Sequence, residues 1–243
     1  MKTINILHLY AEAMDLYGDK KNLEVLCQRI QESGAQAEVK TCELGEKMEL
    51  DGVDMVYLGH GKARNLAAMA PHFCSYGDEI KAHIEDGQLW FVTGNARELF
   101  GREFTTVSGE KLPGISLFDY CGIENNKVFV ADMVGRAAFD KNLRCYGFAN
   151  RTACLIHPNG NPYPLFKEAK GFSDGEQEEG CEGTLYHNFF ATWAMGPVLV
   201  RNPGLMREIL RRLGLDPSIC DFSLEERALQ LVLEEFKDQE KEA

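Results

Sequence analysis

The fold can be inferred most directly from one stretch of sequence, Leu89-Trp90-Phe91-Val92-Thr93-Gly94-Asn95-Ala96-Arg97-Glu98-Leu99-Phe100-Gly101. Its first residues are apolar and predict a buried strand, a small-residue turn follows, and the remainder predicts a short helix. A strand, turn and helix in this order can raise a nucleophile above a parallel sheet, with N–H groups at the helix start placed for an oxyanion. The centre of this turn is Gly94, which has no side chain, so the turn itself carries no nucleophile.

The segments around this stretch alternate between strand and helix patterns. Strands are predicted at residues 4–10, 37–41 and 53–58, and helices at 20–33 and 65–86, the second with a break near Pro71. This order predicts an α/β fold with an open, mostly parallel sheet flanked by helices, as in flavodoxin-like topologies. Ligands of such sheets bind at the carboxyl ends of the strands, which here are the turns after Leu9, Leu58 and Val92.

The second half of the chain has shorter apolar runs separated by Gly, Asn and Pro, which predict additional antiparallel strands. These runs cover residues 105–107, 127–133, 143–149, 152–156 and 165–170, and a further strand is predicted at 184–193. The polar segment 172–180 predicts an exposed loop, and helices are expected at 203–213 and 224–237. Because no linker or repeat interrupts the pattern, one domain over residues 1–243 is the simplest interpretation.

Composition and charge exclude several classes of function. The formal net charge of −12 argues against nucleic acid and against anionic membrane surfaces, since both need clustered lysine and arginine. No window approaches the roughly 20 apolar residues of a membrane span, so no membrane insertion is predicted. The first residues predict a strand and not a signal peptide, which favours a cytoplasmic protein. The eight cysteines form no Cys-x-x-Cys pair, so we expect reduced structural thiols, no metal site and no cofactor.

Five motifs, taken together, resemble those of one enzyme family. They are Met14-Asp15-Leu16-Tyr17-Gly18-Asp19 with Asn22, Gly59-His60-Gly61-Lys62-Ala63-Arg64, the turn at residues 92–101, Tyr146-Gly147-Phe148-Ala149-Asn150, and Glu182-Gly183 through Gly196-Pro197-Val198-Leu199-Val200-Arg201-Asn202-Pro203. In this order they resemble the cobyric-acid-synthase-like class I glutamine amidotransferases, and in particular the amidotransferase subunit of lipid II isoglutaminyl synthase. The resemblance covers almost the whole chain and implies the same α/β fold that the strand and helix patterns predict.

The resemblance also implies a chemistry and shows where this chain departs from it. In that family a cysteine attacks the amide of glutamine, a histidine acts as its base, and the ammonia passes to a partner synthetase. By motif matching, the nucleophile position falls on Gly94 and the base position on Met195. His60 stands where the family usually has glycine. The positions implied for the pocket and the oxyanion turn are Gly59, His60, Gly61, Gly94 and Asn95.

Some other residues have two interpretations at this stage. Arg64 and Arg97 could hold an anionic group near the turn, or they could form ordinary surface ion pairs. Asp15 and Asp19 are interpreted as helix caps. Trp193 and Met195 are expected to fill the vacated space with core side chains. His187 lies about 26 Å from position 195 if the intervening run is extended, too far to replace the missing base.

Three functions follow from these observations. The first is a non-catalytic partner or regulatory subunit of a Mur-ligase-like, ATP-dependent synthetase. The second is an active glutaminase subunit that supplies ammonia for amidation of a peptidoglycan (lipid II) or cobyrinate-like precursor. The third is a stand-alone protein that binds glutamine or a related small molecule. The absence of both reactive groups at the matched positions favours the first.

Overall fold

A computed structural model of the protein describes residues 2–175 and 179–242. Its first sheet has the strand order β11-β12-β4-β3-β1-β2. The strands are β1 (Thr3–Leu9), β2 (Gln36–Cys42), β3 (Met55–Leu58), β4 (Leu89–Thr93), β11 (Thr184–Tyr186) and β12 (Phe189–Thr192). All neighbours pair in parallel except β11 and β12, which form an antiparallel hairpin. The predicted α/β fold with a mostly parallel sheet is therefore confirmed.

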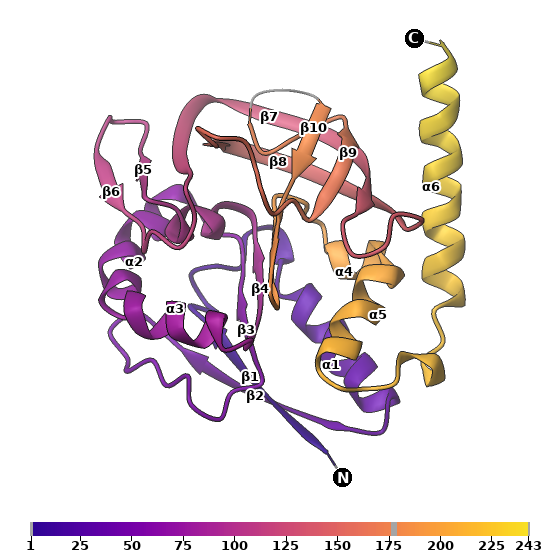
Figure 1. The fold of residues 1–243 in the computed structure, drawn as a ribbon, viewed down its shortest axis with the longest axis horizontal. Helices are drawn as coiled ribbons and strands as arrows, with labels where there is room; N and C mark the ends of the chain where they lie inside the picture. The colour runs from indigo at the N-terminus through magenta and orange to yellow at the C-terminus, as the bar shows by residue number, and fades with distance from the viewer. Residues whose placement is uncertain (1, 176–178, 243) are drawn as a thin grey trace.

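Helices cover both faces of this sheet (Figure 1). On one side lie α2 (Ala63–Ser75) and α3 (Gly77–Glu85), and on the other lie α1 (Lys21–Glu32), α4 (Val198–Arg201) and α5 (Pro203–Arg212). The predicted break near Pro71 is wrong, because α2 continues through this proline and ends at Ser75. The interruption comes at Tyr76, immediately before α3 begins.

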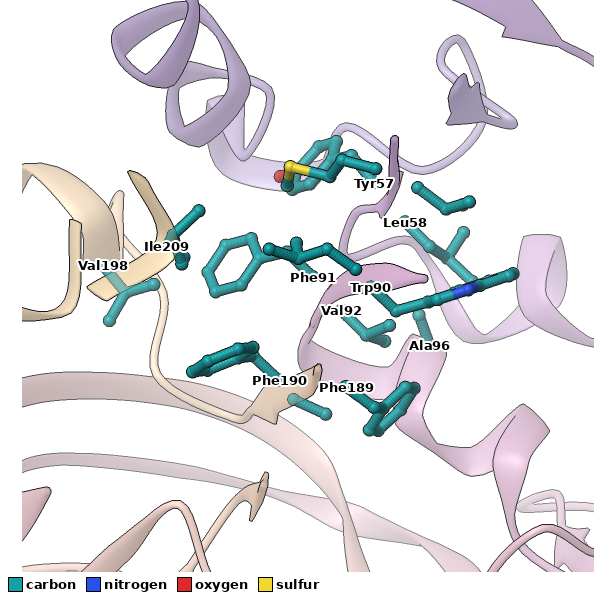
Figure 2. Packing of buried hydrophobic residues seen from close by; sticks show 14 of the residues in the cluster. Tyr57, Leu58, Trp90, Phe91, Val92, Ala96, Phe189, Phe190, Val198 and Ile209 are labelled. Carbon is teal, nitrogen blue, oxygen red and sulfur yellow. The ribbon is translucent and has the colours of Figure 1, made fainter. Parts of the chain in front are cut away.

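The core lies between the sheet and these helices, and β4 is its centre. All five side chains of β4 are buried, as expected for a strand covered on both faces. Figure 2 shows that Phe91 points toward Val198 and Ile209, while Trp90 points to the opposite side. This alternation follows from the two-residue period of a strand. The apolar run at Leu89–Thr93 therefore forms β4, an interior strand of the sheet.

A second sheet, placed above the first in Figure 1, contains most strands of the middle of the chain. Its strand order is β10-β9-β7-β5-β6, with β8 paired to β7. The strands are β5 (Glu103–Thr105), β6 (Lys111–Pro113), β7 (Cys121–Ala137), β8 (Arg144–Ile156), β9 (Phe166–Lys170) and β10 (Glu179–Glu182). The expected antiparallel additions are thus present, but as a sheet of their own built on the long β7–β8 hairpin.

Two predicted segments differ from the structure. The run at 184–193 is not one strand but the β11–β12 hairpin, which reverses at His187, where φ is +50°. The segment 172–180 is not an exposed loop throughout, because Phe172, Ser173 and Asp174 are buried. Residues 176–178 of that segment lie outside the described part of the chain.

Four further elements complete the chain. They are three short 3₁₀ helices, η1 (Leu16–Gly18), η2 (Gly94–Phe100) and η3 (Pro217–Ile219), and the long helix α6 (Ser223–Glu242). An ion pair between Arg29 and Glu225 joins the start of α6 to α1. Within residues 2–175 and 179–242, no helix has the length and apolarity that crossing a bilayer requires.

Candidate functional site

The turn after β4 has the backbone geometry that its sequence predicted. Gly94 follows the strand with φ +59°, in the left-handed region that side chains rarely adopt, and η2 begins at this residue. Every residue from Gly94 to Phe100 is buried. The hydroxyl of Thr93, at the end of β4, donates a hydrogen bond to Asp19. This hydroxyl is therefore engaged within the protein.

His60 fills the space above Gly94. A Cβ atom at position 94 would lie 2.0 Å from His60 Nδ1 and 2.7 Å from His60 Cβ. Contacts of that length do not occur between unbonded heavy atoms, so no side chain fits at position 94 while His60 stays in place. The sequence pointed to Trp193 and Met195 as the residues that fill this region, whereas the imidazole from the β3 turn occupies the volume beside Gly94.

The two backbone N–H groups of this turn are also engaged within the protein. The N–H of Asn95 donates to His60 Nδ1 at 3.0 Å, and the N–H of Gly61 donates to Asn95 Oδ1 at 3.0 Å. Burial lowers the pKa of His60 to about 4, so the imidazole is neutral near neutral pH and its Nδ1 can accept. Donors that would otherwise point at a developing oxyanion are thus satisfied by side chains.

Asp19 holds His60 from the other side, which the sequence did not indicate. This carboxyl is buried and accepts hydrogen bonds from the His60 N–H at 3.0 Å and the Tyr57 hydroxyl at 2.8 Å, besides that of Thr93. Burial raises its pKa, and these donors oppose the rise. Its side chain was expected to cap α1, but it joins the turns after β3 and β4. Asp15 accepts the N–H of Lys20 at 2.9 Å, just before α1.

The glycines that flank His60 allow another segment to approach the turn closely. A Cβ at Gly59 would lie 2.3 Å from the carbonyl oxygen of Met14, and one at Gly61 would lie 2.1 Å from Met14 Sδ. Both positions therefore require glycine for close packing against the loop after β1. His60 does not have a positive φ, so the histidine between them is not strained by its backbone.

Arg97 forms buried ion pairs, not the ordinary surface pair of its second interpretation. The side chain is fully buried, and its terminal nitrogens lie 2.5 and 2.9 Å from the carboxylate of Asp174 and 3.2 Å from Glu182. Burial opposes the charge of Arg97, but the two carboxylates outweigh it and raise the pKa of the guanidinium. This cluster ties the turn after β4 to the second sheet. Arg64 is exposed on α2 and does not line the cavity described below.

Three predicted positions remain. Met195 and Trp193 are buried, and His187 lies away from the turn after β4. Met195 is buried and its N–H donates to the carbonyl of Phe148 on β8 at 2.9 Å. Trp193 is buried beside the turn. His187 lies at the tip of the β11–β12 hairpin, 3.4 Å from Glu85, and half of its side chain is exposed. Although the chain reverses there, the reversal does not carry His187 to the carboxyl end of β4, because it precedes β12.

A cavity of about 130 Å³ opens beside the blocked turn. His60, Gly61 and Asn95 form one wall, Trp193 another, and two carboxylates, Glu98 and Glu124, also line it. Neither Met195 nor Gly94 is among its lining residues. Glu98 was not among the predicted site residues, although it lies only four residues after Gly94. The available signal was a carboxyl side chain between the apolar strand at Leu89–Val92 and the apolar pair Leu99 and Phe100.

Six of the cysteines have thiols that burial makes less acidic. None of the eight is joined in a disulfide, and burial raises the pKa of six of them, namely Cys27, Cys42, Cys74, Cys145, Cys181 and Cys220. A nucleophilic thiolate needs the opposite shift, produced by a nearby cation or a helix N-terminus. The hydrogen bonds from Cys74 and Cys220 go to backbone carbonyl groups.

Comparison with known proteins decides the family to which this geometry belongs. Residues 5–203 match the model of the CobB/CobQ-like glutamine amidotransferase domain. The chain belongs to this family. Two curated relatives of this chain are GatD subunits of the glutamine-hydrolyzing lipid II isoglutaminyl synthase. That of Streptococcus pneumoniae is 25% identical over 97% of this chain and 91% of the relative. That of Staphylococcus aureus is 24% identical over 99% of both chains.

Solved structures of glutamine amidotransferases share the fold. One crystal structure superposes with a TM-score of 0.54 and 17% identity, covering 86% of this chain and 98% of the other. A glutamine amidotransferase of Thermotoga maritima gives a TM-score of 0.52 and 13% identity, over 94% and 92% of the two chains. Both similarities concern the fold of the amidotransferase domain.

Proposed function

We propose that this amidotransferase-family protein is a non-catalytic subunit that binds a Mur-ligase-type synthetase. The observation that carries the proposal is the position of His60. Its ring fills the volume beside Gly94, the position to which the motif match assigns the family's nucleophile. Its Nδ1 accepts a hydrogen bond from the N–H of Asn95. A tetrahedral intermediate at this turn would have neither an attacking atom nor a free donor.

The partner is inferred from what the relatives are called. Both curated relatives are named as subunits of lipid II isoglutaminyl synthase, and this chain aligns with more than nine-tenths of each. An isoglutaminyl synthase acts on a peptidoglycan precursor, which is the substrate class of Mur ligases. We therefore propose that the fold is retained to bind such a synthetase and that the complex concerns peptidoglycan synthesis.

The first test is the release of glutamate from glutamine by the purified protein, alone and mixed with a Mur-ligase-type synthetase from the same source. We expect no glutamate above the buffer background in either case. Turnover by the wild-type protein, particularly if a thiol-blocking reagent abolished it, would show an active glutaminase with a cysteine elsewhere and would overturn the proposal. Co-elution of the two proteins in size-exclusion chromatography tests the partner separately.

The structure indicates which substitutions could rebuild the site. Gly94→Cys with Met195→His restores both family residues but leaves His60 in the space that the new side chain needs. We expect this double variant to remain inactive. Adding His60→Gly removes the obstruction and frees the Asn95 N–H, so the triple variant should release glutamate at least about tenfold above background. The matched control is His60→Gly alone, which should stay inactive.

A further inference from the structure

Glu98 is a buried carboxyl group for which the protein provides no hydrogen-bond donor. Its side chain is 2% exposed, lines the cavity beside the turn, and accepts no hydrogen bond from any residue of the described ranges. Buried carboxyl oxygens are nearly always paired, because leaving them unpaired costs their lost hydration. The unpaired position of Glu98 therefore points to a group that enters the cavity.

The backbone around Glu98 makes room for its carboxyl group. A Cβ atom at Gly122 of β7 would lie 2.4 Å from Glu98 Oε2, so the carboxyl group rests on a position where only glycine fits. Glu124 lies two residues further along β7, on the same face of the strand, and lines the same cavity. The second carboxyl group thus faces the same space as the first, from a neighbouring element.

The two arginines near this pair are already engaged. Arg97 pairs with Asp174 and Glu182, and the terminal nitrogens of Arg151 donate to the carbonyl groups of Ser173, Asp174 and Gly175 at 2.6 to 3.1 Å. Lys62 is exposed at the rim. Apart from Lys62 at the rim, the cavity wall therefore offers two carboxyl groups to a ligand, whereas one interpretation of Arg64 and Arg97 was a site for an anionic group.

We propose that this cavity binds a primary ammonium group, held by Glu98 and Glu124. An ammonium group brings three N–H donors and a positive charge. These match the carboxyl group of Glu98, to which no described residue donates, and that of Glu124, whose Oε2 accepts the Val107 N–H at 3.3 Å. The cavity volume of about 130 Å³ suits a short alkyl chain behind that group. The inference rests on the proposed function in one respect, since the blocked turn leaves a bound ligand unhydrolysed.

Binding of an ammonium group at this cavity should depend on pH, because it requires the ionised form of Glu98. Burial, together with the charge of Glu124, raises the pKa of Glu98 to about 8, while Arg97 and Arg151 act in the opposite direction. His60, also in the wall, is neutral because burial lowers its pKa to about 4. An ammonium ion binds the ionised form of Glu98, so its affinity must rise as the pH rises through about 8. An alkylammonium ion remains charged over that range.

The test is a titration with n-butylammonium chloride at constant ionic strength, followed through the methyl NMR signals of Leu66, Val128 and Ala153 in the cavity wall. We expect the affinity of the wild-type protein to rise between about 10- and 100-fold from pH 6 to pH 9. Butyramide, which has a similar shape but no charge, should bind at least tenfold more weakly than butylammonium at pH 9.

Two variants distinguish a site at Glu98 from general attraction to an acidic protein. Glu98→Gln keeps the size of the side chain and should weaken butylammonium binding at least tenfold and flatten its pH dependence. Glu168→Gln removes an exposed carboxylate on β9 and should change neither. Equal binding of butyramide, or unchanged binding by Glu98→Gln, would overturn the inference. Glutamate release is measured independently, so hydrolysis with intact butylammonium binding would overturn only the proposed function.

Discussion

Replacing Gly94 with alanine is expected to lower the free energy of unfolding by about 3 kcal/mol. Two effects contribute. The left-handed backbone at φ +59° costs a residue with a Cβ atom about 1–2 kcal/mol, and the new methyl group would lie 2.0 Å from His60 Nδ1, which forces a shift in a packed region. Chemical denaturation of wild type and variant measures the difference.

Two comparison variants separate these effects. Gly52 has a similar φ of +73°, but a Cβ atom there would meet nothing within 4 Å, so Gly52→Ala reports the backbone cost alone, about 1 kcal/mol. In a His60→Gly background all the atoms of His60 that a Cβ at position 94 would meet are absent, and Gly94→Ala should then cost no more than Gly52→Ala. A coupling energy of about 1–3 kcal/mol between positions 60 and 94 is expected. Strict additivity would contradict the contact.

Arg97→Met is expected to destabilise the protein by about 3–5 kcal/mol. Without the guanidinium, the carboxylates of Asp174 and Glu182 remain fully buried with no counter-charge from Arg97, and this is the costly way to break a buried ion pair. Arg102→Met is the matched control, because Arg102 pairs with Asp119 at 3.2 Å on the surface, and its loss should change stability by less than about 0.5 kcal/mol.

The loss of stability caused by Arg97→Met should also depend on pH. Burial favours the protonated form of Asp174, but in the wild-type protein Arg97 and His157 hold the pKa of this carboxyl below its usual range. The stability that this ionised carboxylate contributes is fully present above the pKa of Asp174 in the unfolded chain. It is lost as the pH falls through the lower pKa of Asp174 in the folded protein. In the variant, burial raises the pKa of Asp174 as it already raises that of Glu182 in the wild-type protein, so acid stabilises the folded state of the variant. The two stability curves should therefore converge below about pH 4, and a pH-independent difference would contradict the assignment.

The fold could be predicted because its central strand is defined by local sequence. Leu89 to Thr93 form an apolar run that ends at a glycine, and a strand of that kind is typical of a parallel sheet covered on both faces. The β11–β12 hairpin was missed because apolar residues continue through the region and obscure the reversal at His187. The continuation of α2 through Pro71 depends on the packing around it, which local sequence does not reveal.

The site was predicted only in part, because its decisive contacts join residues far apart in the chain. His60 was noticed as unusual, but its contact with Gly94 spans two different turns and has no local signal. The sequence did not decide whether Arg97 binds an anion or forms a surface ion pair. Its main partner, Asp174, lies 77 residues away in a segment predicted to be exposed. The apolar Phe172 within that polar segment was the available sign of burial.

The order of strands in the first sheet has a consequence for synthesis on the ribosome. Strand β12 completes the sheet beside β4, yet Phe189 and its partner Trp90 are separated in the chain by the whole second sheet. Translation of those roughly 100 residues takes about 5–20 s at ordinary rates of elongation. Throughout that interval β4 is an apolar edge without its outer neighbour, open to pairing with other nascent chains. We therefore expect the nascent chain to be prone to aggregation until β12 emerges, however stable the finished protein becomes.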